Sequence, residues 1–355
     1  MKLQYRPGRQ GRGDKEPSPV SPVPDGCLNI RREKKMTENT NKANKINESK
    51  NCDVLCIGQA VIDCITRGQE ADKHRENVFR AEKIELHIGG DAVNESIALA
   101  DMGHKSAIAC GVGTDLAGNL LRSELANRGV DTSGITVMES LTTPIAQLVV
   151  HQDGGRHSIN SRATMLEGYL PDPGMPQIRG ARIVSFASLF RAPLDQAEEV
   201  RRLMHAAKEA GALISVDTKL PTFRELKMEE LADVWPLVDY FFPNEKEAAY
   251  HSGIDEDGGN TEEHFRKMTE FFLSCGMKNV IIKAGADGCY INNAEGFRHL
   301  PALPVEVVDS TGAGDNFVAG FLSGLLRGEE IMACAERGRA RAAQCISRMG
   351  ASERQ

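Results

Sequence analysis

From about residue 181 the chain alternates short apolar runs with longer amphipathic stretches. The apolar runs are RIVSFAS, ALISVD, YFF and NVIIKAG, and the stretches between them predict helices over 194–210, 225–235 and 261–275. Apolar strands that alternate with helices of about ten to fifteen residues are typical of a mostly parallel sheet with helices on both faces. The sequence therefore predicts an α/β fold.

The first half of the chain continues this rhythm with two exceptions. Buried strands are expected in DVLCIGQAVIDCI, from residue 53, and in KSAIACGVG, with helices over 91–103 and in LAGNLLRSELANRG. Two β segments, near 66–88 and 143–163, look half-exposed instead, and the second contains an expected hairpin turn at Asp153-Gly154-Gly155. We assign these two segments to a small β-sheet lid beside the main domain.

Residues 1–50 are polar and rich in Pro, Lys, Asn and Glu, so we expect a disordered N-terminal extension before an ordered domain at 51–355. Met36 offers a second start, which an intact mass that includes Met1 would exclude. The extension lacks the apolar centre of a secretory signal, and no apolar run reaches the ~20 residues that span a bilayer. We therefore expect a cytoplasmic protein.

Composition restricts the class of partner. The chain has 43 Lys and Arg against 50 Asp and Glu, a net charge of −7, which favours neither nucleic acid nor an anionic membrane. The nine cysteines are scattered and form no CxxC pair, which indicates reduced thiols rather than disulfides or a metal site. A small molecule is therefore the expected ligand.

The stretch DSTGAGDNF places three small residues, Gly312, Ala313 and Gly314, directly before Asp315. The stretch separates a strand-like VEVV from an apolar helix, so backbone N–H groups at the helix N-terminus could bind an anion beside a carboxylate base. A tight turn in which Asp315 caps the helix is the alternative. The chain has no GxxxxGK motif, and Leu116 stands where the GxGxxG spacing requires glycine, so neither common nucleotide-binding loop is present.

The pair Gly89 and Gly90 precedes the helix expected over 91–103. Glycines at this point let the backbone approach a ligand closely, and Asp91 and Asn94 offer acceptors and donors for a polyol. A capped helix start without a ligand is the alternative.

The segment PNEKE follows the apolar run YFF. Asn244 and Glu247 in it could orient water around Mg²⁺, which binds oxygen ligands and keeps much of its hydration. The alternative is a solvated first turn of a helix, where acidic residues are favoured by the helix dipole.

Together these motifs resemble the ribokinase-like carbohydrate kinases of the PfkB family. DSTGAGDNFVAGF is similar to the C-terminal signature of that family, and GGDAVNESIALADMG is similar to the N-terminal one. Supporting segments occur in the family's order: GQAVID with Asp63, GVGTDLAG, PNEKEA and IIKAGADG. The resemblance covers about residues 53–351 and implies a three-layer α/β/α domain with a mostly parallel central sheet and a β-sheet lid.

The resemblance also implies transfer of the ATP γ-phosphoryl group to a sugar hydroxyl, with ATP and Mg²⁺ as cofactors. Asp315 matches the catalytic base of the family, and the amides of residues 312–315 match its anion hole. Glu247 matches a position that organises Mg²⁺ through water. The remaining matches are Asp63, Gly89, Gly90, Asp91 and Asn94 for the sugar and Asn244, Lys283, Gly285 and Gly288 for the nucleotide.

Four further positions carry expectations from the same resemblance. Asp309 and the carbonyl of Thr311 match a K⁺ site known in part of the family, a hypothesis that equal activity in K⁺ and in a bulky organic cation would exclude. Arg162, on the second lid segment, could contact substrate, with a surface arginine as the alternative. Lys219 stands where relatives often carry arginine or a neutral residue, so it indicates either a different anionic contact or a solvated side chain.

The resemblance implies a homodimer that pairs through the lid. For the substrate we expect a free ketose or pentose, such as fructose or ribose, because no arginine-lysine cluster for a second phosphate is evident. A nucleoside kinase of the same fold is one alternative, which the aromatic content of 5% opposes only weakly. A catalytically silent, sugar-binding regulatory homologue is the other, and the intact Gly-Ala-Gly-Asp motif argues against it.

Overall fold

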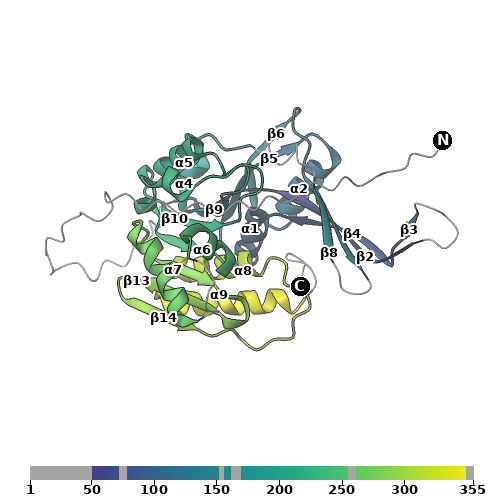
Figure 1. Ribbon diagram of the computed structural model, residues 1–355. Coiled ribbons are helices and arrows are strands. Elements are labelled where there is room, and N and C mark those ends of the chain that lie inside the picture. The colour runs from purple at the N-terminus through teal and green to yellow at the C-terminus, as the bar shows by residue number, and fades with distance from the viewer. Residues whose placement is uncertain (1–49, 72–77, 152–155, 161–168, 255–260, 349–355) are drawn as a thin grey trace, which may run out of the picture. The chain divides into compact units, whose positions relative to one another are not determined.

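The computed structural model describes residues 50–71, 78–151, 156–160, 169–254 and 261–348. The expected N-terminal extension up to residue 49, the hairpin turn at 153–155 and Arg162 lie outside these ranges. The described residues form two sheets, the larger of which is surrounded by helices (Figure 1). Within these ranges no helix combines the length and the apolar character needed to cross a membrane.

The larger sheet has nine strands in the order β14-β13-β12-β11-β10-β9-β1-β5-β6. All pairs from β12 to β6 are parallel, whereas β13 pairs antiparallel with both β12 and β14. This topology confirms the expected α/β fold with a mostly parallel sheet. The strands are β1 (Cys52–Ile57), β5 (Ser106–Gly113), β6 (Asp131–Met138), β9 (Ala181–Leu189), β10 (Leu213–Thr218), β11 (Tyr240–Phe242), β12 (Val280–Lys283), β13 (Cys289–Asn293) and β14 (Gly296–Leu300).

Helices cover both faces of the larger sheet because its strands are apolar on both sides. In β1, Leu55 and Ile57 enter one core, while Val54 and Cys56 enter the other. The first core includes residues of α4 (Pro176–Gly180), α5 (Ala197–Glu209), α6 (Glu245–Ser252) and α7 (Glu262–Ser274). The second core includes residues of α1 (Asp91–Asp101), α2 (Leu116–Asn127), α8 (Ala313–Leu326) and α9 (Ile331–Ile346).

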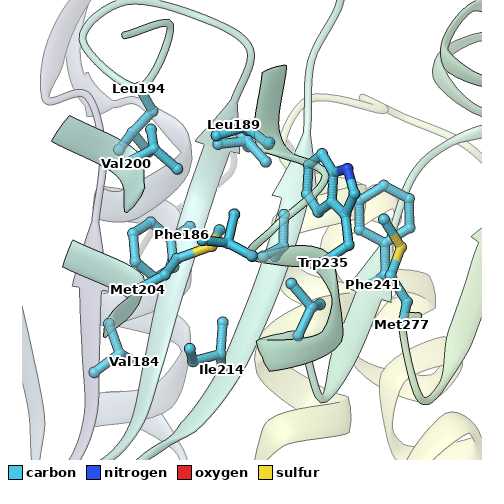
Figure 2. Close-up of a cluster of buried hydrophobic side chains, with 14 of the residues drawn as sticks. Val184, Phe186, Leu189, Leu194, Val200, Met204, Ile214, Trp235, Phe241 and Met277 are labelled. Atoms are coloured by element: carbon cyan, nitrogen blue, oxygen red, sulfur yellow. The ribbon is translucent and has the colours of Figure 1, made fainter. Parts of the chain in front are cut away.

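Trp235 occupies the first core and corrects one expectation. Figure 2 shows its indole beside Phe241 and Met277, and the indole N–H donates to the Met228 carbonyl at 2.8 Å. The helix expected over 225–235 is wrong, because the chain there forms two 3₁₀ turns, η2 (Met228–Leu231) and η3 (Trp235–Leu237). Pro236 cannot donate an N–H to a longer helix, and the short turns direct the indole into the core.

The smaller sheet has the strand order β3-β2-β7-β8, with β4 also paired to β2. The antiparallel pairing of β7 with β8 agrees with the expected hairpin. The apolar run from residue 53 divides between the two sheets, because β1 ends at Ile57 and β2 begins at Val61. The strands of this sheet are β2 (Val61–Ala71), β3 (Phe79–Arg80), β4 (Lys83–Gly89), β7 (Ile145–His151) and β8 (Arg156–Asn160).

A buried leucine and an exposed leucine should contribute differently to the free energy of unfolding. Leu203 of α5 is fully buried, whereas Leu116, the first residue of α2, is 88% exposed. We expect Leu203→Ala to lower the free energy of unfolding by about 2–5 kcal/mol, because it removes packed methyl groups and leaves a cavity. Leu116→Ala, the matched control, should change it by less than about 0.5 kcal/mol. Chemical denaturation measures both values, and equal losses would contradict the assignment of the core.

Candidate active site

The Gly-Ala-Gly-Asp motif forms the N-terminus of α8. Gly312 caps the helix with φ of 73°, a left-handed conformation that favours glycine. A Cβ atom at Gly314 would lie 3.3 Å from Nζ of Lys283, so the small residue lets a lysine approach the helix terminus. The first-turn N–H groups of a helix lack partners within the helix. This terminus therefore combines backbone donors, a favourable dipole and a nearby ammonium group, as an anion requires.

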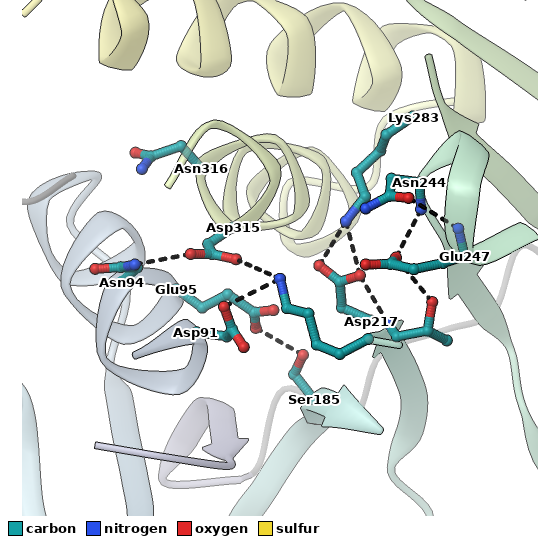
Figure 3. Close-up of polar contacts among 12 residues, drawn as sticks. Asp91, Asn94, Glu95, Ser185, Asp217, Asn244, Glu247, Lys283, Asp315 and Asn316 are labelled. Atoms are coloured by element: carbon teal, nitrogen blue, oxygen red, sulfur yellow. Dashed lines mark hydrogen bonds and ion pairs between the residues drawn. The ribbon is translucent and has the colours of Figure 1, made fainter. Parts of the chain in front are cut away.

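Asp315, in the first turn of α8, is only 4% exposed. Its Oδ2 accepts a hydrogen bond from Asn94 Nδ2 of α1 at 2.7 Å, and its Oδ1 lies 4.0 Å from Nζ of Lys219. The same Nζ lies 3.1 Å from Oδ1 of Asp91. Figure 3 shows how Asp91, Asn94 and Asp315 converge from two helices. The structure thus brings together two motifs that are far apart in the sequence.

The surroundings of Asp315 favour its protonated form. Burial raises the pKa of Asp315 to about 7, the carboxylate of Asp91 adds to this effect, and the ammonium of Lys219 opposes it. A carboxylate whose pKa lies near neutrality is suited to accept a proton from a bound hydroxyl.

Asp63 lies in the smaller sheet, on β2 opposite His87 of β4. Burial raises the pKa of Asp63 to about 6, while His87 lowers it and Asp91 raises it further. A Cβ atom at Gly89 would collide with the Asp63 carboxylate, and one at Gly90 would collide with the Gln59 carbonyl. The glycine pair is therefore needed for close packing at this junction.

Asn244 and Glu247 form a capping box at the start of α6. The Glu247 amide donates to Oδ1 of Asn244 at 3.0 Å, and Oε2 of Glu247 accepts from the Asn244 amide at 2.9 Å and from the Thr218 hydroxyl at 3.0 Å. Glu247 is only 3% exposed, so the alternative of a solvated first turn is wrong for this residue. Burial raises the pKa of Glu247, an effect that Lys283 opposes.

Lys283, at the end of β12, binds a carboxylate that the sequence analysis missed. Its Nζ donates to both oxygens of Asp217, at 2.7 and 2.6 Å, and Asp217 is fully buried at the end of β10. After Lys283 the chain turns through Gly285, with φ of 54°, and Gly288, with φ of 93°. The only signal for Asp217 is an acid at the carboxyl end of an apolar strand, where ligands of open α/β sheets bind.

Glu95 is the second buried acid that the sequence analysis missed. It follows Asn94 on α1, has no exposed surface, and accepts a hydrogen bond at Oε2 from the Ser185 hydroxyl at 2.7 Å. Burial raises the pKa of Glu95 well above its usual range, although the hydrogen bond from Ser185 opposes the shift. Figure 3 shows Glu95 and Ser185 next to the convergence of Asp91 and Asp315.

The suggested K⁺ ligands lie just before α8. Oδ1 of Asp309 accepts hydrogen bonds from the Thr311 amide at 3.0 Å and from the Thr311 hydroxyl at 2.7 Å, so this oxygen binds within its own loop. K⁺ binding here stays a prediction.

The carboxylates of this site could bind Mg²⁺ only together with water and phosphate ligands. Across the described ranges, no group of three or more His, Cys, Asp and Glu side chains could hold a metal ion. Mg²⁺ usually keeps several waters and binds through one or two carboxylates together with substrate phosphates. The buried carboxylate of Glu247, in the same cluster as Lys283, is a donor of this type (Figure 3).

The chain is similar to known proteins over most of its length. Residues 51–355 match a family model described as pfkB family carbohydrate kinase. A cytidine kinase of Thermococcus kodakarensis is 27% identical over 269 residues, which cover 74% of this chain and 88% of the relative. Fructokinase-1 of Oryza sativa subsp. japonica is 30% identical over 244 residues, which cover 66% of this chain and 72% of the relative.

Solved structures show the same fold. Arabidopsis thaliana ribokinase, in complex with ribose and ATP, superimposes with a TM-score of 0.72 at 22% identity, covering 84% of this chain and 94% of its own. An E. coli protein assigned as ribokinase II, in complex with ATP and Mg²⁺, gives a TM-score of 0.67 at 23% identity and covers 85% and 94% of the two chains.

The raised pKa of Asp315 predicts how stability depends on pH. The folded protein holds this proton up to about pH 7, whereas the unfolded chain releases it near pH 3.9. Stability is therefore lost as pH rises between these values, by up to about 4 kcal/mol. We expect Asp315→Asn to raise the melting temperature at pH 8 and to raise it less at pH 5, where only about a third of this loss has occurred.

Asp239→Asn is the matched control for this measurement. Asp239 is equally buried, but Nζ of Lys208 and Nζ of Lys278 each lie 2.6 Å from its carboxylate. Loss of this paired charge should lower the melting temperature at pH 8. A melting temperature of Asp315→Asn below that of the wild type at pH 8 would contradict the effect assigned to burial.

Proposed function

The chain belongs to the pfkB family of carbohydrate kinases, which are phosphotransferases with an alcohol acceptor, and we propose that it phosphorylates a sugar hydroxyl with Asp315 as the general base. The observation that carries this proposal is the position of Asp315, buried in the first turn of α8 and hydrogen-bonded to Asn94. The base and the expected anion site thereby share one helix terminus.

The proposed reaction is an in-line displacement. The acceptor hydroxyl gives its proton to Asp315 as its oxygen forms a bond to the γ-phosphorus of ATP. The bond from that phosphorus to the bridging oxygen breaks, and its electron pair leaves with ADP. Such a transfer depends on positioning and charge neutralisation more than on covalent chemistry.

We assign the phosphate contacts to the start of α8. The amides of Gly312, Ala313, Gly314 and Asp315 are the proposed donors to the transferred group, and a preformed backbone donor of this kind is typically worth about 3 kcal/mol in the transition state. Lys283 supports this assignment because a Cβ atom at Gly314 would lie only 3.3 Å from its Nζ.

The acceptor is proposed to bind where the two sheets meet. Asp63 contributes from the smaller sheet, and the segment from Gly89 to Asn94 contributes from the end of β4 and the start of α1. The raised pKa values of Asp63 and Asp315 support a site with little water. Arg162, which lies outside the described residues, is proposed as an additional contact.

The nucleotide is proposed to lie along Asn244, Lys283, Gly285 and Gly288. Mg²⁺, when bound, would neutralise phosphate charge, and Glu247 would hold it through water. The buried, hydrogen-bonded carboxylate of Glu247 supports this role, because its orientation is fixed by Asn244 and Thr218.

A free ketose or pentose is the proposed acceptor class. Relatives of the chain include the fructokinase named above and a ribokinase of Haemophilus influenzae, which supports this class. A nucleoside acceptor is the second candidate, because a cytidine kinase is another relative of the chain. A silent sugar-binding homologue is disfavoured by the intact set formed by Asn94, Gly312 and Asp315.

Asp315→Asn tests the proposed base. We expect this variant to bind ATP and to lose at least about a hundredfold in turnover, the usual scale for a lost general base. The measurement is coupled ADP release with MgATP and a panel of hexoses, pentoses, sugar acids, phosphosugars and nucleosides. Turnover of the variant near the wild-type value would refute the role of Asp315, and nucleosides as the best substrates would favour the second candidate.

The smaller sheet also supports the proposed homodimer. The strand register places Ile84 and Leu86 of β4 and Ile159 of β8 on the face opposite to Asp63. These three apolar side chains are each more than half exposed, and Ile145 of β7 is 48% exposed. A second copy of the chain, pairing through this face, would bury a patch that is otherwise in water.

Light scattering tests the dimer. The wild type should have twice the mass of one chain, and the double variant Ile84→Lys with Leu86→Lys should have the mass of one chain, because lysine opposes burial of the face. Leu116→Lys, on α2, is the matched control and should remain dimeric. A monomeric wild type would exclude the proposal.

A further inference from the structure

Lys219 directly follows β10, at the edge of the sheet where the site is built. Its Nζ lies 3.1 Å from Oδ1 of Asp91 and 4.0 Å from Oδ1 of Asp315, and its side chain is 22% exposed. It is therefore neither the solvated lysine considered from the sequence nor a lysine with one partner. Its ammonium group lies between a proposed acceptor ligand and the proposed base.

The backbone of Lys219 is held on both sides. Its amide donates to the Leu189 carbonyl of β9 at 2.9 Å, and its carbonyl contacts Nε2 of His251 at 3.2 Å. Because a carbonyl can only accept, the His251 proton lies on Nε2. Burial lowers the pKa of His251 to about 4, so this ring is neutral at pH 7, and it stacks on Phe190 with a centroid distance of 3.9 Å. The lysine is thus attached to a rigid frame, as a positioned catalytic group requires.

The charges around Lys219 keep its ammonium group protonated. Burial alone would lower the pKa of Lys219, but nearby carboxylates outweigh it and raise the pKa well above the usual range; these are Asp91 on α1, Asp315 on α8, Asp217 on β10 and Glu247 on α6. Lys283, by contrast, is engaged by both oxygens of Asp217. An ammonium group has three donors, so Lys219 can contact Asp91 and a substrate at the same time.

A hydroxyl that gives its proton to Asp315 must lie within about 2.6–3.2 Å of a carboxylate oxygen. Oδ2 of Asp315 already accepts a hydrogen bond from Asn94, so the hydroxyl is expected at Oδ1, the oxygen that lies 4.0 Å from Nζ of Lys219. We propose that Lys219 is a catalytic residue that contacts the phosphoryl group during its transfer to the acceptor oxygen. The inference rests on the proposed function.

In this role Lys219 keeps its proton throughout. The acceptor proton passes to Asp315, the new O–P bond forms as the bond to ADP breaks, and the ammonium group neutralises charge on the phosphoryl oxygens. In a site with little water such a fixed cation stabilises the transition state more than an exposed one would. Before substrate binds, Asp91 holds the ammonium in place.

Variants of Lys219 test the inference. We expect Lys219→Met to lower kcat by at least about a hundredfold, the scale of other electrostatic contacts to a transition state, with KM for ATP within about threefold of wild type. Lys219→Arg, which keeps the charge, should recover at least about a tenth of wild-type kcat. Lys278→Met is the matched control, because it also removes a lysine paired with a buried acid, Asp239, and should leave kcat unchanged.

The pH profile separates catalysis from a structural role. Lys219 lowers the pKa of Asp315. Lys219→Met, which removes the positive charge, should therefore move the acidic limb of the kcat/KM profile to higher pH, whereas Lys219→Arg, which keeps the charge, should not. Five charged or titratable groups interact electrostatically with Asp315. They are Asp91 and Glu95 on α1, Asp217 on β10, Lys219 directly after β10, and Cys345 on α9. Lys219→Gln gives the same comparison if the methionine variant does not fold.

The outcomes distinguish the inference from the function on which it rests. A kcat of Lys219→Met within about threefold of wild type, with Asp315→Asn inactive, would overturn the role of Lys219 and leave the kinase intact. An unshifted acidic limb in a folded Lys219→Met would also overturn it. A wild type that phosphorylates no acceptor in the panel would overturn the proposed function and the inference together.

Discussion

The burial of the Asp315 carboxylate is the constraint on which the surrounding elements depend. A group that carries charge away from water must be met by donors and cations. These come from separate parts of the chain, Asn94 from α1 and Lys219 from the end of β10. Helices α1 and α8 therefore pack in the same core on one face of the sheet, and β10 ends close to both. Gly314 permits the approach of Lys283 to the same helix terminus.

The charges of the site are unequal in number, and burial moderates the difference. Lys219 and Lys283 face five carboxylates, which are those of Asp91, Glu95, Asp217, Glu247 and Asp315. Burial raises the pKa values of Glu95, Glu247 and Asp315, so these three groups carry less negative charge than their number suggests. An acidic site repels a free polyphosphate unless cations accompany it. A nucleotide bound together with Mg²⁺ suits this cluster better than the nucleotide alone, which agrees with the proposed reaction.

The parts predicted from the sequence are those set by local pattern and sheet topology. Apolar alternation indicated the parallel sheet, whereas the resemblance to the PfkB family was what implied that Asp91 and Asp315 serve one site. The pattern failed where tertiary packing decides, as at Trp235, where two short 3₁₀ turns and a buried indole stand in place of the helix that periodicity favoured. Asp217 was missed because it is a single acid at the end of an apolar strand, and Glu95 because it is one of several acids in α1. Only the folded arrangement shows that both are buried, with Asp217 bound to Lys283 and Glu95 bound to Ser185.

The short connection between β1 and β2 has a mechanical consequence. Residues 58–60 carry the chain from the larger sheet into the smaller one, and Gly89 and Gly90 carry it back. The two connections touch, because a Cβ atom at Gly90 would collide with the Gln59 carbonyl. The chain also passes between the sheets after β6 and after β8, so these few peptide bonds, which adjoin Asp63 and Asp91, must absorb a share of any rotation of one sheet against the other. This connection thus shares its backbone with the proposed acceptor contacts, so an acceptor bound there would restrict the angle between the sheets.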